Sequence, residues 1–157
     1  WRRAKADYPS HAGRFTGGPA YFTHIVNSTK LLLEKQNMKP SDFNYAVFHM
    51  PNGSFPLKVG KMLGFTTEQI EPSYVVPQLG NSYSASALMG LVSTLEQAKP
   101  GDLLYFASYG SGAGSDAFIF KATEQIIEIQ KSFKKQIKNK TYINYAKYLH
   151  IMNSITM

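Results

Sequence analysis

The residues best suited to chemistry in this sequence are a histidine, an asparagine and a serine, each in a short polar loop. His49 lies in FHMPNGSFPLK, directly after an apolar run and directly before a Pro-Asn-Gly turn. Asn81 lies in GNSYSAS, and Ser111 lies in the glycine-rich stretch YGSGAG. Imidazole and carboxamide groups both offer N–H donors, which stabilise negative charge that develops on a carbonyl oxygen. The three loops together predict a site that binds and polarises a carbonyl group.

Each feature also has an ordinary structural explanation. His49 could satisfy a turn carbonyl, Gly80-Asn81 is a common turn, and the glycines around Ser111 fit a hairpin.

The composition excludes several other chemistries within this chain. The sequence has no cysteine, which rules out disulfides, thiolate metal sites and cysteine nucleophiles. The four histidines lack metal-ligand spacing, so we expect no metal site, and the glycine-rich stretch lacks the Lys-Ser/Thr ending of a P-loop.

Alternating helix and strand patterns surround these loops. Apolar residues at spacings of three and four predict amphipathic helices over 19–36, 55–63 and 82–98. Runs rich in β-branched and aromatic residues predict strands over 44–48, 73–76, 103–108 and 117–120. The last two strands should be antiparallel, and the helices between the others indicate parallel crossovers. The predicted fold class is therefore α/β, a mixed sheet with helices on both faces.

Most of the net charge of +7 lies near the carboxyl terminus, where residues 121–157 hold seven lysines and two glutamates. We expect a basic tail at 123–157 with helices over 123–138 and 142–152, following a domain at 1–122. The tail lacks the interleaved aromatic residues of nucleic-acid readers, so a solvated surface is the simpler explanation and no nucleic-acid partner is expected. No run reaches the roughly 18 apolar residues of a membrane span, which favours a cytoplasmic protein without membrane contact.

In order and spacing, HMPNG, GNSYSAS and SYGSGAGSDAF resemble the carboxy-terminal half of the thiolase superfamily. YPSHAGRFTGGPAYF and YINYAKYLH are similar to segments of hydroxymethylglutaryl-CoA (HMG-CoA) synthases of the archaeal kind. The resemblance runs from about Trp1 to His150. It implies that residues 1–122 form the carboxy-terminal half of a thiolase-like fold. The histidine and the GNxxxAS pattern are shared with initiating ketoacyl-(acyl carrier protein) synthases, which remain an alternative, as does a non-catalytic thiolase-like scaffold.

The resemblance implies an acyltransferase that condenses acetyl-CoA with acetoacetyl-CoA to HMG-CoA, in the mevalonate pathway to isoprenoids. His49 would hold the acetoacetyl ketone and handle its proton, while Asn81 and Ser111 would orient acyl oxygens. Arg14 and Thr16, in GRFTG, match positions that contact the coenzyme A substrate. Lys58 matches a further basic position in coenzyme A binding, where lysine or arginine suits a phosphate. Coenzyme A thioesters are substrates here, and no resident cofactor is expected.

The chain departs from the family pattern in ways that bear on activity. Ser54 stands where the family generally has a lysine, and the tail lacks the family's basic Arg-Gly-Lys ending. The family's nucleophilic cysteine and basic glutamate belong to the amino-terminal half. Because the sequence begins at Trp1, we expect a piece of a larger polypeptide that needs its own amino-terminal half as a partner. The resemblance further implies a homo-oligomer, in a possible complex with a thiolase and a small bridging protein.

The family fold also has a strand that immediately precedes Trp1 and lies in the middle of its sheet. We expect the strands over 44–48 and 103–108 to lack a shared neighbour in this chain, which leaves backbone groups unpaired.

Residues 1–157 alone are predicted to be inactive, because no acyl-enzyme can form without the cysteine. The measurement is acetoacetyl-CoA consumption by the purified 157-residue chain in the presence of acetyl-CoA. Clear turnover would contradict the expectation that an amino-terminal half is needed.

Overall fold

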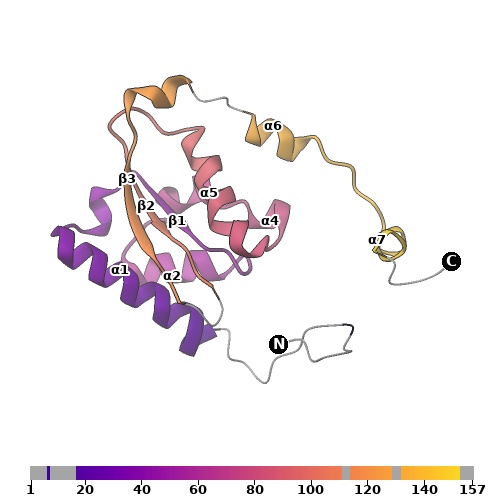
Figure 1. The fold of residues 1–157 in the computed structure, drawn as a ribbon, viewed down its shortest axis with the longest axis horizontal. Helices are drawn as coiled ribbons and strands as arrows, with labels where there is room; N and C mark the ends of the chain where they lie inside the picture. The colour runs from indigo at the N-terminus through magenta and orange to yellow at the C-terminus, as the bar shows by residue number, and fades with distance from the viewer. Residues whose placement is uncertain (1–6, 8–16, 111–113, 129–131, 153–157) are drawn as a thin grey trace.

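Three strands form the centre of the molecule, and helices cover both faces of their sheet (Figure 1). The computed structural model describes residues 7, 17–110, 114–128 and 132–152. The strands are β1 (Tyr45–Phe48), β2 (Leu103–Ala107) and β3 (Ala117–Lys121), in the order β1-β2-β3. β1 pairs with β2 in parallel, and β2 pairs with β3 antiparallel. The predicted α/β class with a mixed sheet is confirmed.

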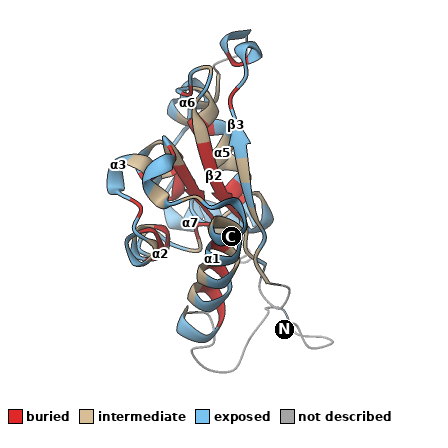
Figure 2. Cartoon of the chain, turned by 90° about the vertical axis from the view of Figure 1, so that its left-hand side faces the viewer, coloured by how far each residue is buried: buried red, intermediate tan, exposed pale blue. Residues whose placement is uncertain are grey.

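The two faces of the sheet pack against different helices because successive strand residues point to opposite sides. One face carries Phe48 and Tyr105 and packs against α1 (Thr23–Gln36), α2 (Phe55–Leu63) and α3 (Thr67–Ile70). The other carries Val47 and Phe106 and packs against α5 (Ser86–Leu95). Figure 2 shows β2 buried between these layers. The helices predicted over 19–36, 55–63 and 82–98 are thus present.

Short helical elements complete the described chain. η1 (Gly17–Phe22) is a π-helix that leads directly into α1. The remaining elements are η2 (Pro40–Asp42), η3 (Glu71–Ser73), α4 (Val76–Leu79), η4 (Tyr83–Ala85), η5 (Glu124–Glu128), α6 (Phe133–Lys138) and α7 (Tyr145–Ile151). No helix in the described ranges is long and apolar enough to cross a membrane.

The strand predicted over 73–76 is wrong, because none of its residues lies in a strand. η3 ends at Ser73 and α4 begins at Val76. Pro72 and Pro77 each occupy one of the first two positions of these helices, where a missing N–H group costs nothing. Ser73 still binds the sheet through its side chain, because its hydroxyl donates to the Ala46 carbonyl at 3.0 Å. Val75 and Val76 therefore pack with Met50 in a core cluster at the start of α4 rather than pairing in the sheet.

The expectation that β1 and β2 lack a shared neighbour is also wrong for this structure. Tyr45 lies opposite Leu104, and the pairing continues to Phe48 opposite Ala107. The two strands therefore satisfy each other's backbone groups directly.

The basic tail is held to the domain by a carboxylate. The single helix predicted over 123–138 is wrong, since η5 and α6 occupy this region. Glu96 accepts hydrogen bonds from the backbone N–H groups of Phe133 (2.5 Å) and Lys134 (3.1 Å), at the start of α6. Negative charge is favourable at a helix amino terminus, where backbone N–H groups are free. Ile137 packs against the cluster of Met50, Val75 and Val76, so α6 lies on the domain, whereas α7 lies farther out (Figure 1).

The layer spacing between α5 and β1 depends on Gly90. A Cβ at this position would meet the Ser73 carbonyl oxygen at 3.0 Å and Val47 Cγ1 at 3.2 Å. Gly90→Val is expected to lower the free energy of unfolding by about 1–3 kcal/mol, because the added atoms overpack this contact. Gly17→Val is the matched control, since no atom lies within 4 Å of its Cβ. Urea denaturation measures both, and equal effects at the two glycines would contradict the prediction.

Candidate active site

His49 extends strand β1 by one residue and ends its pairing with β2. Its backbone N–H donates to the Ala107 carbonyl at 2.9 Å, which continues the parallel ladder. The side chain is only 6% exposed. The predicted position of His49, at the carboxyl end of a strand and before a Pro-Asn-Gly turn, is therefore confirmed. Loops that leave this edge of an α/β sheet converge on a crevice, which makes it a common site for ligands.

Hydrogen bonds from two further elements fix the backbone of His49 and Met50. The Tyr21 hydroxyl, from η1, donates to the His49 carbonyl at 2.6 Å. The Ser86 hydroxyl, at the start of α5, accepts from the Met50 N–H at 2.9 Å and donates to the Met50 carbonyl at 3.3 Å. Tyr21, Ser86 and Met50 are all buried. The dipeptide is thus held from η1, α5 and β2, which leaves its backbone little freedom to move.

Two tyrosine rings flank the His49 imidazole. The centroid of the His49 ring lies 6.4 Å from the centroid of the Tyr21 ring and 5.8 Å from that of the Tyr109 ring. Tyr109 lies two residues after the end of β2. None of the hydrogen bonds among the described residues involves an imidazole nitrogen of His49. Burial lowers the pKa of His49 below its usual value near 6.5, because charge is disfavoured away from water. The imidazole is therefore neutral at neutral pH, with one N–H donor and one acceptor nitrogen.

Asn52 organises the loop after His49. Its side-chain oxygen accepts from the Ser54 N–H and hydroxyl, both at 2.9 Å, and from the Phe55 N–H at 3.1 Å. These bonds satisfy backbone donors at the start of α2, as helix-capping side chains do. Ser54 thus takes part in closing this loop.

Asn81 occupies an exposed turn before α5. Its side-chain oxygen accepts from the Tyr83 N–H at 2.9 Å, and Tyr83 adopts a left-handed conformation with φ of 52°. No hydrogen bond joins Asn81 to His49 in this structure. The two loops are joined instead through Ser86, five residues after Asn81, which binds Met50. No hydrogen bond among the described residues uses the carboxamide nitrogen of Asn81, which is a donor group.

Ser111, Arg14 and Thr16 lie outside the described residues. The predicted site formed by His49, Asn81 and Ser111 together therefore remains a prediction. The base of the Ser111 loop is nevertheless defined. Gly110 and Gly114 form an antiparallel bridge, with N–H···O distances of 2.9 and 3.0 Å. Tyr109 precedes this bridge and contacts the His49 ring. The loop that carries Ser111 therefore starts beside His49.

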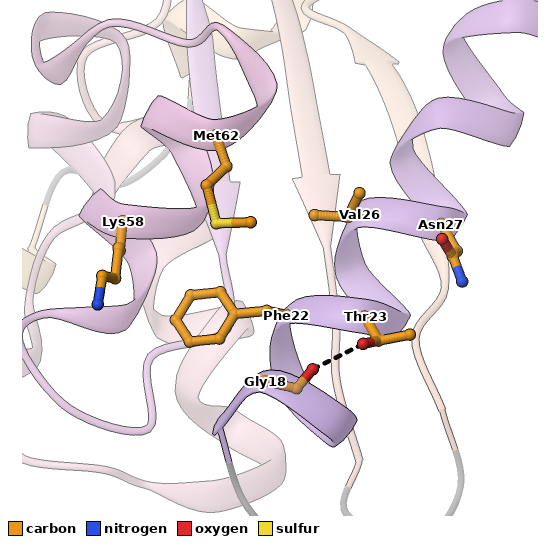
Figure 3. A pocket seen from close by; sticks show the side chains of 7 residues that line it. All are labelled: Gly18, Phe22, Thr23, Val26, Asn27, Lys58 and Met62. Atoms are coloured by element: carbon orange, nitrogen blue, oxygen red, sulfur yellow. Dashed lines mark hydrogen bonds between the residues drawn. The ribbon is translucent and has the colours of Figure 1, made fainter.

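A cavity of about 520 Å³ opens between η1, α1 and α2 (Figure 3). Phe22, Val26 and Met62 form apolar parts of its lining, and Lys58 places its ammonium group at the edge. The other lining residues are Gly18, Thr23 and Asn27. Lys58 is exposed on α2. Such a cavity suits a ligand with both apolar and anionic parts.

The described residues contain no cluster of three or more acidic or histidine side chains that could hold a metal ion. The His49 imidazole is a buried titratable group in this region, and its lowered pKa favours the neutral form, which can donate and accept hydrogen bonds.

Sequence reasoning did not identify Tyr21 or Ser86 as parts of this site. Ser86 lies in the segment GNSYSAS and Tyr21 lies in the segment YPSHAGRFTGGPAYF, but no pattern in the sequence marks either as a hydrogen-bond partner of the residues around His49. Each binds a backbone group 28 or 36 residues away. A buried tyrosine or serine usually has a hydrogen-bond partner, but the sequence does not say which.

The low pKa of His49 predicts that acid destabilises the fold. The unfolded chain binds a proton near pH 6.5 and the folded chain binds it only at lower pH, so the free energy of unfolding falls as the pH drops below about 6.5. His49→Gln should remove this part of the pH dependence, because glutamine binds no proton. Urea denaturation between about pH 8 and about pH 5 measures the difference. Parallel pH profiles for the two proteins would contradict a neutral, buried His49.

Comparison with known proteins identifies relatives of this chain. The chain is 55% identical over 151 residues to the hydroxymethylglutaryl-CoA synthase of Methanosarcina mazei, covering 94% of this chain and 43% of the relative. It is 47% identical over 161 residues to that of Pyrobaculum aerophilum, covering 100% of this chain and 46% of the relative. The chain thus spans less than half the length of these curated relatives, and the predicted resemblance to archaeal HMG-CoA synthases is confirmed.

Solved structures support the same fold. A crystal structure of an HMG-CoA synthase complexed with CoA superposes with a TM-score of 0.76 at 23% identity, covering 94% of this chain and 42% of that one. The model of the family described as 3-oxoacyl-(acyl-carrier-protein) synthase III C terminal matches residues 33–122. This match covers more than half of the chain and includes β1, β2, β3 and His49. The chain therefore belongs to the 3-oxoacyl-(acyl-carrier-protein) synthase III C-terminal family, within the thiolase-like fold.

Proposed function

We propose that this chain forms the carboxy-terminal part of an HMG-CoA synthase, an acyltransferase that condenses acetyl-CoA with acetoacetyl-CoA. The observation that carries the proposal is the 55% identity to a hydroxymethylglutaryl-CoA synthase over 94% of the chain. The product, HMG-CoA, is a precursor in the mevalonate pathway.

In this reaction His49 binds the ketone of the acetoacetyl group. A carbon–carbon bond forms between the methyl carbon of the acetyl thioester and the ketone carbon, and negative charge develops on the ketone oxygen. A neutral imidazole can donate its N–H to that oxygen and then give up the proton as the alkoxide forms. The lowered pKa of His49 supports this role, because it keeps the imidazole neutral, with an N–H group that can donate to the ketone oxygen. Asn81 and Ser111 orient the acyl oxygens of the substrate.

The cavity between α1 and α2 takes part of coenzyme A. Its apolar lining suits the uncharged parts of the ligand, and the Lys58 ammonium suits a phosphate. Arg14 and Thr16 precede η1, whose residues Gly18 and Phe22 line the same cavity. We therefore assign Arg14, Thr16 and Lys58 to the binding of the coenzyme A substrates.

The amino-terminal half supplies the cysteine that carries the acetyl group and the glutamate that removes its methyl proton. This chain leaves a surface suited to such a partner. Phe118 and Phe120 on β3 are 47% and 40% exposed, on the same side of the sheet as α5. Leu88 and Val92, one turn apart on α5, are 55% and 44% exposed. Exposed apolar groups gathered in this way indicate a contact with another folded unit.

The proposal includes the assembly and setting of the enzyme. The acting unit is a homo-oligomer of the whole enzyme, with a thiolase and a small bridging protein as further partners. Its charged thioester substrates are water-soluble, so the reaction is assigned to the cytoplasm.

A 3-oxoacyl-(acyl-carrier-protein) synthase is the second candidate, because the matching family model carries that description. The two candidates differ in the acyl acceptor. Turnover with acetoacetyl-CoA and none with malonyl-(acyl carrier protein) would support the HMG-CoA synthase. Turnover with malonyl-(acyl carrier protein) and none with acetoacetyl-CoA would support the second candidate. Binding of coenzyme A without either reaction would support a non-catalytic scaffold.

His49→Gln is expected to lower kcat for condensation by about 100-fold or more, because general acid catalysis contributes about 10²–10⁴-fold. The assay follows release of free coenzyme A from acetyl-CoA and acetoacetyl-CoA by the protein as its gene encodes it. His24→Gln is the matched control, since His24 also lies beside Tyr109, at a centroid distance of 6.3 Å. Activity of His49→Gln within threefold of the native protein would overturn the assignment of His49.

A further inference from the structure

Tyr21 occupies an unusual place for a polar side chain. Its relative exposure is 0%, and its ring packs among Phe22, Phe55 and Tyr109 at centroid distances of 5.2, 5.1 and 5.4 Å. Phenylalanine would supply the same apolar contacts without a hydroxyl to remove from water. Burial of the hydroxyl is therefore explained by its hydrogen bond, which it donates to the His49 carbonyl at 2.6 Å.

The His49 carbonyl marks the point where the chain leaves β1. Its N–H belongs to the ladder with Ala107, and the next residue, Met50, is already bound by Ser86. Rotation of the peptide between His49 and Met50 would change the direction in which the chain leaves the strand. The Tyr21 hydroxyl opposes that rotation because a hydrogen bond weakens steeply with misalignment.

We infer that Tyr21 is a positioning residue for the imidazole of His49, acting through the backbone carbonyl and through the ring beside it. This inference rests on the proposed function of His49 as the group that binds the ketone. Tyr21 does not contact the reacting atoms itself. It fixes the Cα of His49, and together with Tyr109 it limits the orientations of the imidazole. A small misplacement of such a group is known to slow catalysis greatly.

The sequence neighbour of Tyr21 gives this arrangement a second consequence. Phe22 lines the cavity proposed for coenzyme A, while its neighbour Tyr21 bonds to the His49 carbonyl and packs edge-on against the Phe22 ring at a centroid distance of 5.2 Å. A single turn of η1 therefore contributes one wall of the substrate cavity and one hydrogen bond to the proposed catalytic residue. Substrate that packs against Phe22 stabilises the same turn that holds His49.

Tyr21→Phe tests the inference, because it keeps the ring and removes only the hydroxyl. Tyr105→Phe is the matched control. Tyr105 is also fully buried, and its hydroxyl forms a comparable hydrogen bond, with Thr29 at 2.5 Å, but not with His49. Both variants lose one buried hydrogen bond, so a general loss of stability should affect them alike.

In the protein as its gene encodes it, Tyr21→Phe is expected to lower kcat about tenfold with KM for acetoacetyl-CoA within about twofold of native. Tyr105→Phe should keep kcat within about twofold. The thermal midpoint of each variant is measured first, so that activities are compared well below unfolding. Replacement of Tyr21 by 4-aminophenylalanine, which keeps a donor at the same ring position, should restore most of kcat. Equal losses in the two phenylalanine variants, or no loss in either, would overturn the inference.

A second readout does not depend on the reaction. The imidazole ¹⁵N and ¹H resonances of His49 are followed by NMR as a function of pH, and assigned with His49→Gln. Tyr21→Phe should shift these resonances and their titration midpoint, and Tyr105→Phe should leave both in place. Unchanged His49 resonances in Tyr21→Phe would overturn the positioning role. Shifted resonances in a protein without synthase activity would retain the positioning of His49 while rejecting the proposed function.

Discussion

The hydrogen bond between the His49 N–H and the Ala107 carbonyl carries the sheet ladder into the candidate site. It is the last rung of the parallel pairing between β1 and β2, so the position of the imidazole depends on the register of those strands. A shift of one residue would turn His49 to the other face of the sheet. That register is set by burial on both faces, with Phe48 on one side and Val47 on the other. The proposed chemistry therefore depends on a packed core rather than on a flexible loop.

The polar contacts around His49 come from elements that this core places. η1 brings Tyr21 to the His49 carbonyl, and α5 brings Ser86 to Met50. α5 can approach β1 closely because Gly90 has no side chain at its contacts with Val47 of β1 and with the Ser73 carbonyl. The result is a rigid backbone that surrounds a neutral imidazole. Preorganised donors of this kind act without rearrangement when charge develops on a substrate.

Much of this arrangement was predictable from the sequence, and the failures have a common cause. His49 at a strand end followed from an apolar run that stops at Pro51, and the long helices followed from apolar spacing. Val75 and Val76 were misassigned because a short apolar run does not distinguish a strand from a buried turn. Tyr21 and Ser86 were missed because their partners are distant in sequence. Burial and partner choice arise only when the layers assemble.

The attachment of α6 has a consequence for the surface of the protein. Both oxygens of Glu96 are used, one for each of two successive N–H groups, so the contact sets the rotation of α6 about its axis as well as its position. Phe133 and Ile137 are thereby turned inward. Lys134, Lys135 and Lys138 are turned towards water. A single acidic side chain thus determines which side of this helix packs on the domain and which sides leave its lysines exposed to water.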